Sequence, residues 1–135
     1  MKSLVIVGAG GFGREALGIV RDIGGFEPLA FVDASPDRVG TVVDGVPVAG
    51  GDAALADLRV RGAQALFVAI GDGRVRQRLW RIGKELGFEL ATLVHPMAYR
   101  ASGVTVGEGS VLYPGSVTMA GVRVGHGVLI NAGAT

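Results

Sequence analysis

The chain has 135 residues, a hydrophobic content of 49%, a formal net charge of +1 and no cysteine. This length suits one domain, or one small domain with part of another, and the near-neutral charge gives no reason to expect a nucleic-acid partner. The lack of cysteine excludes disulfides, thiolate metal ligands and a cysteine nucleophile, and it fits a cytoplasmic location. No apolar stretch approaches the roughly 20 residues of a membrane span. We therefore expect neither a membrane segment nor a metal site.

The first part of the chain, to about residue 94, alternates short β-type runs with helical patterns. The run Leu4 to Val7 is continuously apolar, as expected for a parallel strand covered on both faces. Helices are predicted over 13–24, 51–62 and 74–87, and further strands within 28–35, 64–73 and 88–96. The segment 43–51 is predicted as a short extended piece between two turns. Asp52 is a possible cap of the second helix. This alternation predicts an α/β fold with an open parallel sheet and flanking helices.

After about residue 101 a six-residue period replaces the helical one. Three series keep their phase through this part, and the first consists of glycine alone: Gly103, Gly109, Gly115, Gly121, Gly127 and Gly133. The second, mostly apolar, is Val106, Leu112, Thr118, Val124 and Ile130, and the third is small or β-branched, from Val104 to Ala134. Hexapeptide repeats of this kind form parallel β-helices, with each unit as one flat side of a coil. Glycines and small residues are expected at the corners.

Several motifs in order resemble one known family. They are "VIVGAGGFGRE", "FVDASP", "GVPVAGG", "VAIGDGRVRQRL", "LVHPMA" and the hexapeptides through "LINAGAT". Together they resemble the bacterial hexapeptide-repeat sugar acetyltransferases of the sialic-acid O-acetyltransferase and nucleotide-amino-sugar N-acetyltransferase type. The resemblance implies a Rossmann-like domain over 1–97 that binds a nucleotide-sugar acceptor such as a UDP-sugar. It also implies that 98–135 begin a left-handed β-helix.

The resemblance implies the chemistry as well. The complete protein would be a homotrimer that holds acetyl-CoA between neighbouring β-helices and acetylates an amino or hydroxyl group of the sugar. The family's catalytic base is a histidine that would fall three residues beyond Thr135. We therefore expect no catalytic residue within these 135 residues, and expect a truncated chain that binds the acceptor without transferring acetyl.

The glycine loop after the first strand is the main candidate for ligand binding. Gly8, Gly10, Gly11, Phe12 and Gly13 fall in a G-x-G-x-x-G pattern between a strand and a helix. Gly8 and Gly10 allow the backbone to approach a phosphate, and Gly13 allows close packing of the helix. The alternative is a tight turn without a ligand.

Four more residues are candidates for substrate binding. Asp33 ends the second strand, where an acid meets a ribose in dinucleotide folds, although it also suits an aspartate-initiated turn. Gly71 and Asp72 follow a buried strand at the expected ligand edge of the sheet, although Asp72 equally suits a helix cap. The resemblance implies that Asn131 faces the acceptor amine, and an asparagine at a coil corner is the alternative.

Other polar residues are given structural roles. The basic cluster of the helix over 74–87 is interpreted as a solvated face, and attraction of an anionic nucleotide or CoA is the alternative. The cluster consists of Arg74, Arg76, Arg78, Arg81 and Lys84. Trp80 is expected to be partly buried. His95, before Pro96, is expected to have a role at the junction of the two parts, and a general base is the alternative. His126 is expected to be exposed.

Two other functions remain open on the sequence alone. The glycine loop and Asp33 also suit an NAD(P)-binding protein, although the α/β part offers little more than one of the two halves that a dinucleotide needs. A non-enzymatic sugar-nucleotide sensor or a trimeric scaffold is the third possibility, because a short β-helix would leave an unpaired strand edge.

Overall fold

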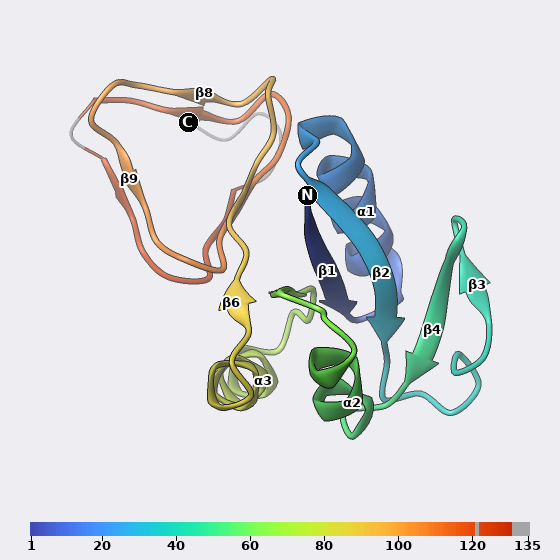
Figure 1. Ribbon diagram of the computed structural model, residues 1–135. Coiled ribbons are helices and arrows are strands. Elements are labelled where there is room, and N and C mark those ends of the chain that lie inside the picture. The colour runs from blue at the N-terminus through green and yellow to red at the C-terminus, as the bar shows by residue number, and fades with distance from the viewer. Residues whose placement is uncertain (121, 131–135) are drawn as a thin grey trace.

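The computed structural model describes residues 1–120 and 122–130, where an α/β domain leads into a three-sided coil (Figure 1). The strands of the main sheet are β1 (Lys2–Val7), β2 (Phe26–Val32), β3 (Val42–Val43), β4 (Val46–Gly50), β5 (Ala65–Val68) and β6 (Glu89–Leu90). Their order is β3-β4-β2-β1-β5-β6, and every pair is parallel except β3 with β4. The α/β fold predicted from the alternating pattern is confirmed.

The helices cover both faces of this sheet. They are α1 (Gly11–Ile23), α2 (Ala54–Val60) and α3 (Gly73–Glu85). Side chains of β1 alternate between two cores, as the pleat of a strand requires. Leu4 and Ile6 pack in the core that includes α1, whereas Val5 and Val7 pack in the core that includes α2 and α3. This two-sided burial explains the continuous apolar run in the sequence.

The antiparallel pair β3–β4 is a hairpin at the edge of the sheet. Its turn contains Asp44 and Gly45, both with positive φ, of 48° and 86°. An Asp-Gly pair with two positive φ values is the usual solution for a two-residue hairpin turn. The segment predicted as a short extended piece between turns is therefore this hairpin.

Residues 93–120 and 122–130 wind into a parallel β-helix with a triangular outline in Figure 1. Its strands are β7 (Leu93–Val94), β8 (Tyr99–Arg100), β9 (Thr105–Val106), β10 (Val111–Leu112), β11 (Val117–Thr118), β12 (Arg123–Val124) and β13 (Leu129–Ile130). Leu93 pairs with Val111, and Val111 pairs with Leu129. Three hexapeptides therefore complete one turn of the coil.

Glycines make the corners of this coil, as the six-residue period predicts. Gly103, Gly109, Gly115 and Gly127 all have positive φ, between 63° and 83°, a region that residues with a Cβ avoid. The apolar series fills the interior, where Leu112 is fully buried. Gly121 and Gly133 lie outside the described residues.

Two local predictions were wrong. The last extended segment, expected as a single strand over 88–96, is two strands: β6 pairs with β5 in the sheet, and β7 pairs with β10 in the coil. Asp52 does not cap α2, whose N-cap is Ala53 without a side-chain hydrogen bond. Asp52 instead forms an ion pair with Arg78 of α3, at 3.4 Å. Pairing with a residue distant in sequence replaces the local contact that the sequence suggests.

The two parts pack against each other through α1 and α3. The core that includes α1 also contains Leu93, Val111 and Tyr113 of the coil. On α3, the Trp80 indole lies against the corner glycines Gly109 and Gly127 of successive turns. A Cβ at Gly127 would overlap the indole ring, so this corner admits the tryptophan only because it is glycine.

Candidate functional site

A cavity of about 160 Å³ opens where β1 and β5 end. Its lining residues come from the end of β1, from the segments after β1, β2, β4 and β5, and from α3: Val7, Gly8, Asp33, Ala34, Arg38, Asp52, Ile70, Val75, Arg78 and Leu79. From β1 the chain continues to β2 on one side, and it later returns to β5 on the other side. The cavity therefore lies at the carboxyl edge of the sheet where the strand order reverses, which is the usual ligand position in open α/β folds.

Asp33 is the buried polar centre of this cavity. One carboxylate oxygen, Oδ2, accepts hydrogen bonds from Ala9 N at 2.8 Å and Arg38 Nη1 at 3.2 Å. The other, Oδ1, accepts from Ser35 N at 2.8 Å. Burial by itself raises the pKa of this carboxyl, but the hydrogen bonds from Ala9, Ser35 and Arg38 outweigh it and hold the pKa below its usual value. Asp33 is therefore a fixed anion that ties the glycine loop to the next turn.

The glycine loop is shaped by close backbone approaches. Gly8 has a φ of 103°, and a Cβ there would lie 2.5 Å from Ala69 O. A Cβ on Gly13 would overlap Gly8 O, so this glycine is needed for the helix to pack on the loop. The first turn of α1 has no acidic residue, and among the described residues no side chain caps it. Its N–H groups are therefore available to an anion.

A second hollow lies beside the start of α1. Its larger part, of about 440 Å³, is lined by Gly11, Arg14, Glu15 and Asp44. A neighbouring part of about 310 Å³ reaches Ala9 and the β3–β4 hairpin. Arg14 pairs with Asp44 through its Nε at 3.2 Å and remains largely exposed. The start of α1 thus carries a cation next to its free N–H groups.

The structure separates the remaining sequence candidates. Phe12 packs edge-on against Phe67, with ring centroids 6.1 Å apart, and contributes to the core beneath the loop. Asp72 caps α3, because its Oδ1 accepts from Arg74 N at 2.9 Å and Val75 N at 3.1 Å. Gly71 and Asp72 are exposed and do not line the cavity. Asn131 lies outside the described residues.

Of the predicted residues, the structure brings Gly8 and Asp33 into the cavity at the end of β1 and Gly11 into the hollow beside α1. Gly10 lies close to Arg38, whose Nη1 would be 3.3 Å from a Cβ there. Sequence reasoning did not assign the lining residues Arg38 and Asp52 to a site, whereas attraction of a nucleotide was the less favoured alternative for the cluster that includes Arg78. Arg38 was hidden within a turn sequence and Arg78 within a basic helix face, so only tertiary packing distinguishes them.

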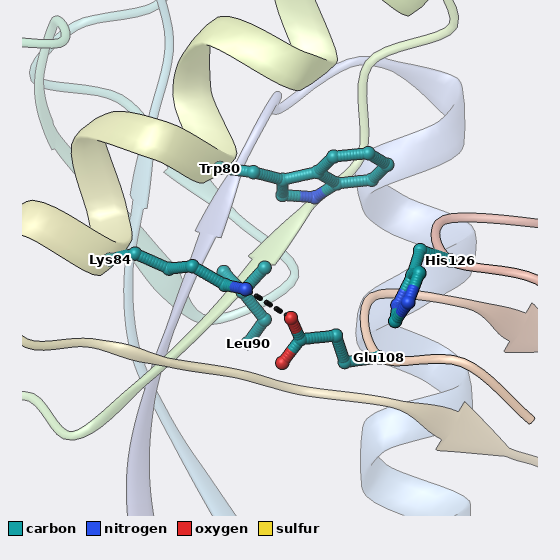
Figure 2. A pocket seen from close by; sticks show the side chains of 5 residues that line it. All are labelled: Trp80, Lys84, Leu90, Glu108 and His126. Atoms are coloured by element: carbon teal, nitrogen blue, oxygen red, sulfur yellow. Dashed lines mark hydrogen bonds and ion pairs between the residues drawn. The ribbon is translucent and has the colours of Figure 1, made fainter.

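At the junction of α3 and the coil there is a separate cavity of about 200 Å³ (Figure 2). It is lined by Trp80, Lys84, Leu90, Glu108 and His126, and Lys84 forms an ion pair with Glu108 across it. Arg76 covers the Trp80 ring, with its guanidinium carbon 5.5 Å from the ring centroid. His126 is exposed and Trp80 is half-buried, as expected from the sequence. This cavity therefore lies between the α/β domain and the coil.

His95 is held in one orientation at the other junction, beside α1. Its Nδ1 accepts a hydrogen bond from Met97 N at 2.9 Å, so the ring proton is on Nε2. Nε2 lies 2.8 Å from Asp22 Oδ2 and donates to it. Because both ring nitrogens are engaged, this histidine has no free lone pair to act as a base. The junction role expected for His95 fits this arrangement.

Within the described part of the chain, no cluster of three or more potential ligand side chains could hold a metal ion. Over the same residues, no helix has the length and apolar character needed to cross a membrane.

These features define a class: a Rossmann-like α/β domain with a cavity at the carboxyl edge of its sheet, followed by a parallel β-helix. The family model for the PglD N-terminal domain matches residues 3–82, and the chain belongs to this family. A comparison with curated proteins found no match.

Several solved structures, two of them of acetyltransferases by name, are similar over nearly the whole chain. A variant of perosamine N-acetyltransferase from Caulobacter crescentus, in complex with CoA and GDP-perosamine, is 39% identical with a TM-score of 0.85; the match covers 96% of this chain and 60% of that one. The acetyltransferase domain of PglB from Neisseria gonorrhoeae, in complex with acetyl coenzyme A, is 29% identical with a TM-score of 0.69. The match covers 97% of this chain and 68% of that domain's chain. WeeI from Acinetobacter baumannii shares the fold. It is 23% identical with a TM-score of 0.77, and the match covers 97% of this chain and 61% of that one. This chain thus spans less than two thirds of the perosamine enzyme.

Proposed function

We propose that this chain binds the nucleotide part of a nucleotide-linked sugar, and that the protein containing it acetylates an amino or hydroxyl group of that sugar with acetyl-CoA. The observation that carries the proposal is the cavity at the ends of β1 and β5 beside the uncapped start of α1. The perosamine relative, solved with GDP-perosamine, supports the substrate class.

The nucleotide would lie across the glycine loop. The cavity around Asp33, Arg38 and Arg78 suits the nucleoside, because it combines apolar walls with a few fixed polar groups. The diphosphate would then accept hydrogen bonds from the free N–H groups of α1, with Arg14 alongside. Gly71, Asp72 and Asn131 remain proposed contacts of the substrate.

Acetyl-CoA as the donor is supported by the PglB relative, which was solved with acetyl coenzyme A. In the complete protein, the acceptor nitrogen or oxygen would attack the thioester carbon, a histidine beyond Thr135 would take its proton, and the thiol of CoA would leave. A homotrimer of left-handed β-helices would provide the donor site between neighbouring coils. On this proposal, the 135 residues alone do not transfer acetyl.

Calorimetric titration of this chain with UDP, GDP, the corresponding nucleotide-amino-sugars, NADH and acetyl-CoA tests the proposal. We expect a UDP- or GDP-linked ligand to bind and acetyl-CoA to bind weakly or not at all. Absence of binding by every nucleotide-sugar would contradict the proposal. Acetylation of an amino-sugar nucleotide by the 135 residues alone would contradict the predicted position of the base.

The size of the α/β part makes NAD(P) the less favoured ligand. A dinucleotide needs two mononucleotide-binding halves, and the part of the chain ahead of the coil offers little more than one. Tight binding of NADH in the same titration would favour this alternative. Concentration-dependent assembly without any nucleotide binding would favour a scaffold.

A further inference from the structure

Arg76 differs from the other basic residues of α3. Arg74, Arg78, Arg81 and Lys84 are exposed, whereas Arg76 is half-buried. Its Nε is buried and has no hydrogen-bond partner among the described residues. A buried donor without a partner costs stability, so this position holds a guanidinium at a cost to the fold. The solvated face expected from the sequence therefore does not include Arg76.

The Arg76 guanidinium holds the turn between β5 and α3. Its Nη1 donates to Ile70 O at 3.2 Å and to Gly71 O at 3.4 Å. Side chains of a helix point back toward its N-terminus, so an arginine at the fourth position of α3 reaches the carbonyl oxygens that precede the helix. The two hydrogen bonds thus fix the path of the chain from the strand to the helix.

This turn forms part of the wall of the cavity at the ends of β1 and β5. Ile70 lines that cavity, whereas Arg76 does not. A Cβ at Gly8 would lie 3.0 Å from Ile70 Cδ1, so the same side chain rests on the glycine loop. Ala69 N also donates to Val7 O at 2.7 Å. Any effect of Arg76 on a ligand in the cavity must therefore act through the turn.

The same guanidinium lies over the ring that contacts the coil. Its central carbon is 5.5 Å from the centroid of the Trp80 ring, which is within the range of a cation–π interaction. The indole reaches from α3 toward the coil in Figure 2, where it lies against the corner glycines Gly109 and Gly127. One side chain thus connects the wall of the cavity with the contact between the α/β domain and the coil.

We propose that Arg76 is a positioning residue, which holds the β5–α3 turn in the form that binds a nucleotide and links occupation of the cavity to the environment of Trp80. This inference rests on the proposed function, because the cavity is the proposed nucleoside site. Replacing a buried charged group by an apolar side chain of similar size is often neutral or stabilising. Stability alone thus gives no account of an arginine with an unpartnered buried donor.

The test compares Arg76→Met and Arg76→Lys with the matched control Arg81→Met, by calorimetric titration of the full chain with UDP and with GDP. Methionine keeps an unbranched apolar stem but donates no hydrogen bond. We expect Arg76→Met to weaken the tighter-binding diphosphate by about tenfold, with a melting temperature that is unchanged or raised. Lysine keeps one donor for the turn, so Arg76→Lys is expected to recover part of the affinity.

The control changes the same charge on the same helix. Arg81 is exposed and lines neither the cavity at the sheet edge nor the one at the junction with the coil. We expect Arg81→Met to bind the diphosphate as the unaltered chain does. A loss of affinity in Arg81→Met as large as that in Arg76→Met would show a general effect of charge and would overturn the inference.

The emission of the single tryptophan supplies a measurement that a structural role alone would not change. Trp80 does not line the cavity, so a ligand there reaches the indole only through neighbouring residues. We expect saturation with the diphosphate to shift the emission in the unaltered chain and in Arg81→Met, and to leave it unchanged in Arg76→Met. Binding without any shift in the unaltered chain would contradict the link to Trp80.

The two proposals fail in different ways. If the unaltered chain binds neither diphosphate, the proposed function is wrong, and the role of Arg76 falls with it. If it binds one and Arg76→Met binds equally tightly, the nucleotide site stands and Arg76 does not position it. If the melting temperature of Arg76→Met falls together with the affinity, and Arg76→Lys recovers neither, Arg76 is a structural residue and the inference is wrong.

Discussion

Asp33 joins three segments of the chain through one carboxylate, which accepts from the glycine loop, from Ser35 and from Arg38. Asp33→Asn keeps the shape of the side chain but places an NH₂ group where a donor already points. We expect the free energy of unfolding, measured in urea, to fall by about 1–3 kcal/mol, and nucleotide affinity to fall with it. The exposed neighbour Asp37, changed to Asn, is the control and should change the unfolding free energy by less than about 0.5 kcal/mol.

The lowered pKa of Asp33 also predicts how stability depends on pH. The folded pKa lies below the ordinary value of 3.8, so the native state favours the ionised form. This contribution is fully present above the ordinary value and is lost as the pH falls through the lower, folded value. The difference in unfolding free energy between the unaltered chain and Asp33→Asn should therefore shrink in acid. An equal difference at about pH 7 and about pH 3 would mean that ionisation of Asp33 does not stabilise the fold.

Asp33 also shows how far sequence reasoning reaches at a single residue. Its place at the end of a strand was predictable, and so were both an aspartate-initiated turn and a ligand role. The hydrogen bonds to Ser35 and Arg38 are contacts within the turn, whereas the bond to Ala9 joins two segments that no local pattern connects. The sequence predicts a turn at Asp33, but it does not show that Arg38 of this turn lines the cavity.

At the scale of elements, α3 begins at a cap that can be tested separately from any site. Asp72→Ala removes the acceptor for Arg74 N and Val75 N, and loss of an N-cap costs about 0.5–2 kcal/mol. We expect this loss in thermal or urea unfolding. If Asp72 is a cap alone, nucleotide affinity measured by calorimetry will remain unchanged once the protein is folded. A drop in affinity with unchanged stability would restore the ligand role that the sequence also allowed.

The contact between α3 and the coil can be isolated with two corner glycines. Gly127→Ala and Gly103→Ala both place a Cβ at a positive φ, of 63° and 83°. A Cβ at position 127 would overlap the Trp80 ring, whereas at position 103 it meets nothing within 4 Å among the described residues. We therefore expect Gly127→Ala to be destabilised by at least about 1 kcal/mol more than Gly103→Ala.

The emission of the chain's single tryptophan provides the second measurement for this pair. It should shift toward that of a solvated indole in Gly127→Ala and stay unchanged in Gly103→Ala. Equal effects of the two substitutions on stability and on emission would show that the packing of the indole does not depend on the glycine at position 127.

Elements with a strong period were predictable, and the joints between them were not. The six-residue glycine series predicted the coil because each corner needs the same backbone conformation. The segment 88–96 reads as one strand, since nothing in its apolar pattern shows that β6 belongs to the sheet and β7 to the coil. The contact of Trp80 with the coil was not predicted for a similar reason. The pattern of an amphipathic helix shows that a tryptophan is half-buried, but not which residues it packs against.

At the scale of the whole molecule, a nucleotide-sugar bound in the cavity should also stabilise α3 and the coil corners in contact with it. The α3 helix contributes Val75, Arg78 and Leu79 to that cavity and Trp80 to the contact with the coil. A ligand at about 100 times its dissociation constant stabilises the native state by about 2.7 kcal/mol. We expect slower amide hydrogen exchange both in α3 and at the coil corners that Trp80 touches. Slowing limited to the glycine loop would mean that the two parts do not respond together.

The 18-residue turn of the coil, seen in the pairing of Leu93, Val111 and Leu129, restricts how proteins built this way can change in length. Insertion of one hexapeptide keeps every side chain on its own side of the backbone, but it advances all later residues to the next face of the prism. A group that had faced the α/β domain would then face away from it. Only gains or losses of complete turns inside the coil keep the later residues on their original faces, so internal insertions and deletions in natural relatives and engineered versions should come in multiples of three hexapeptides.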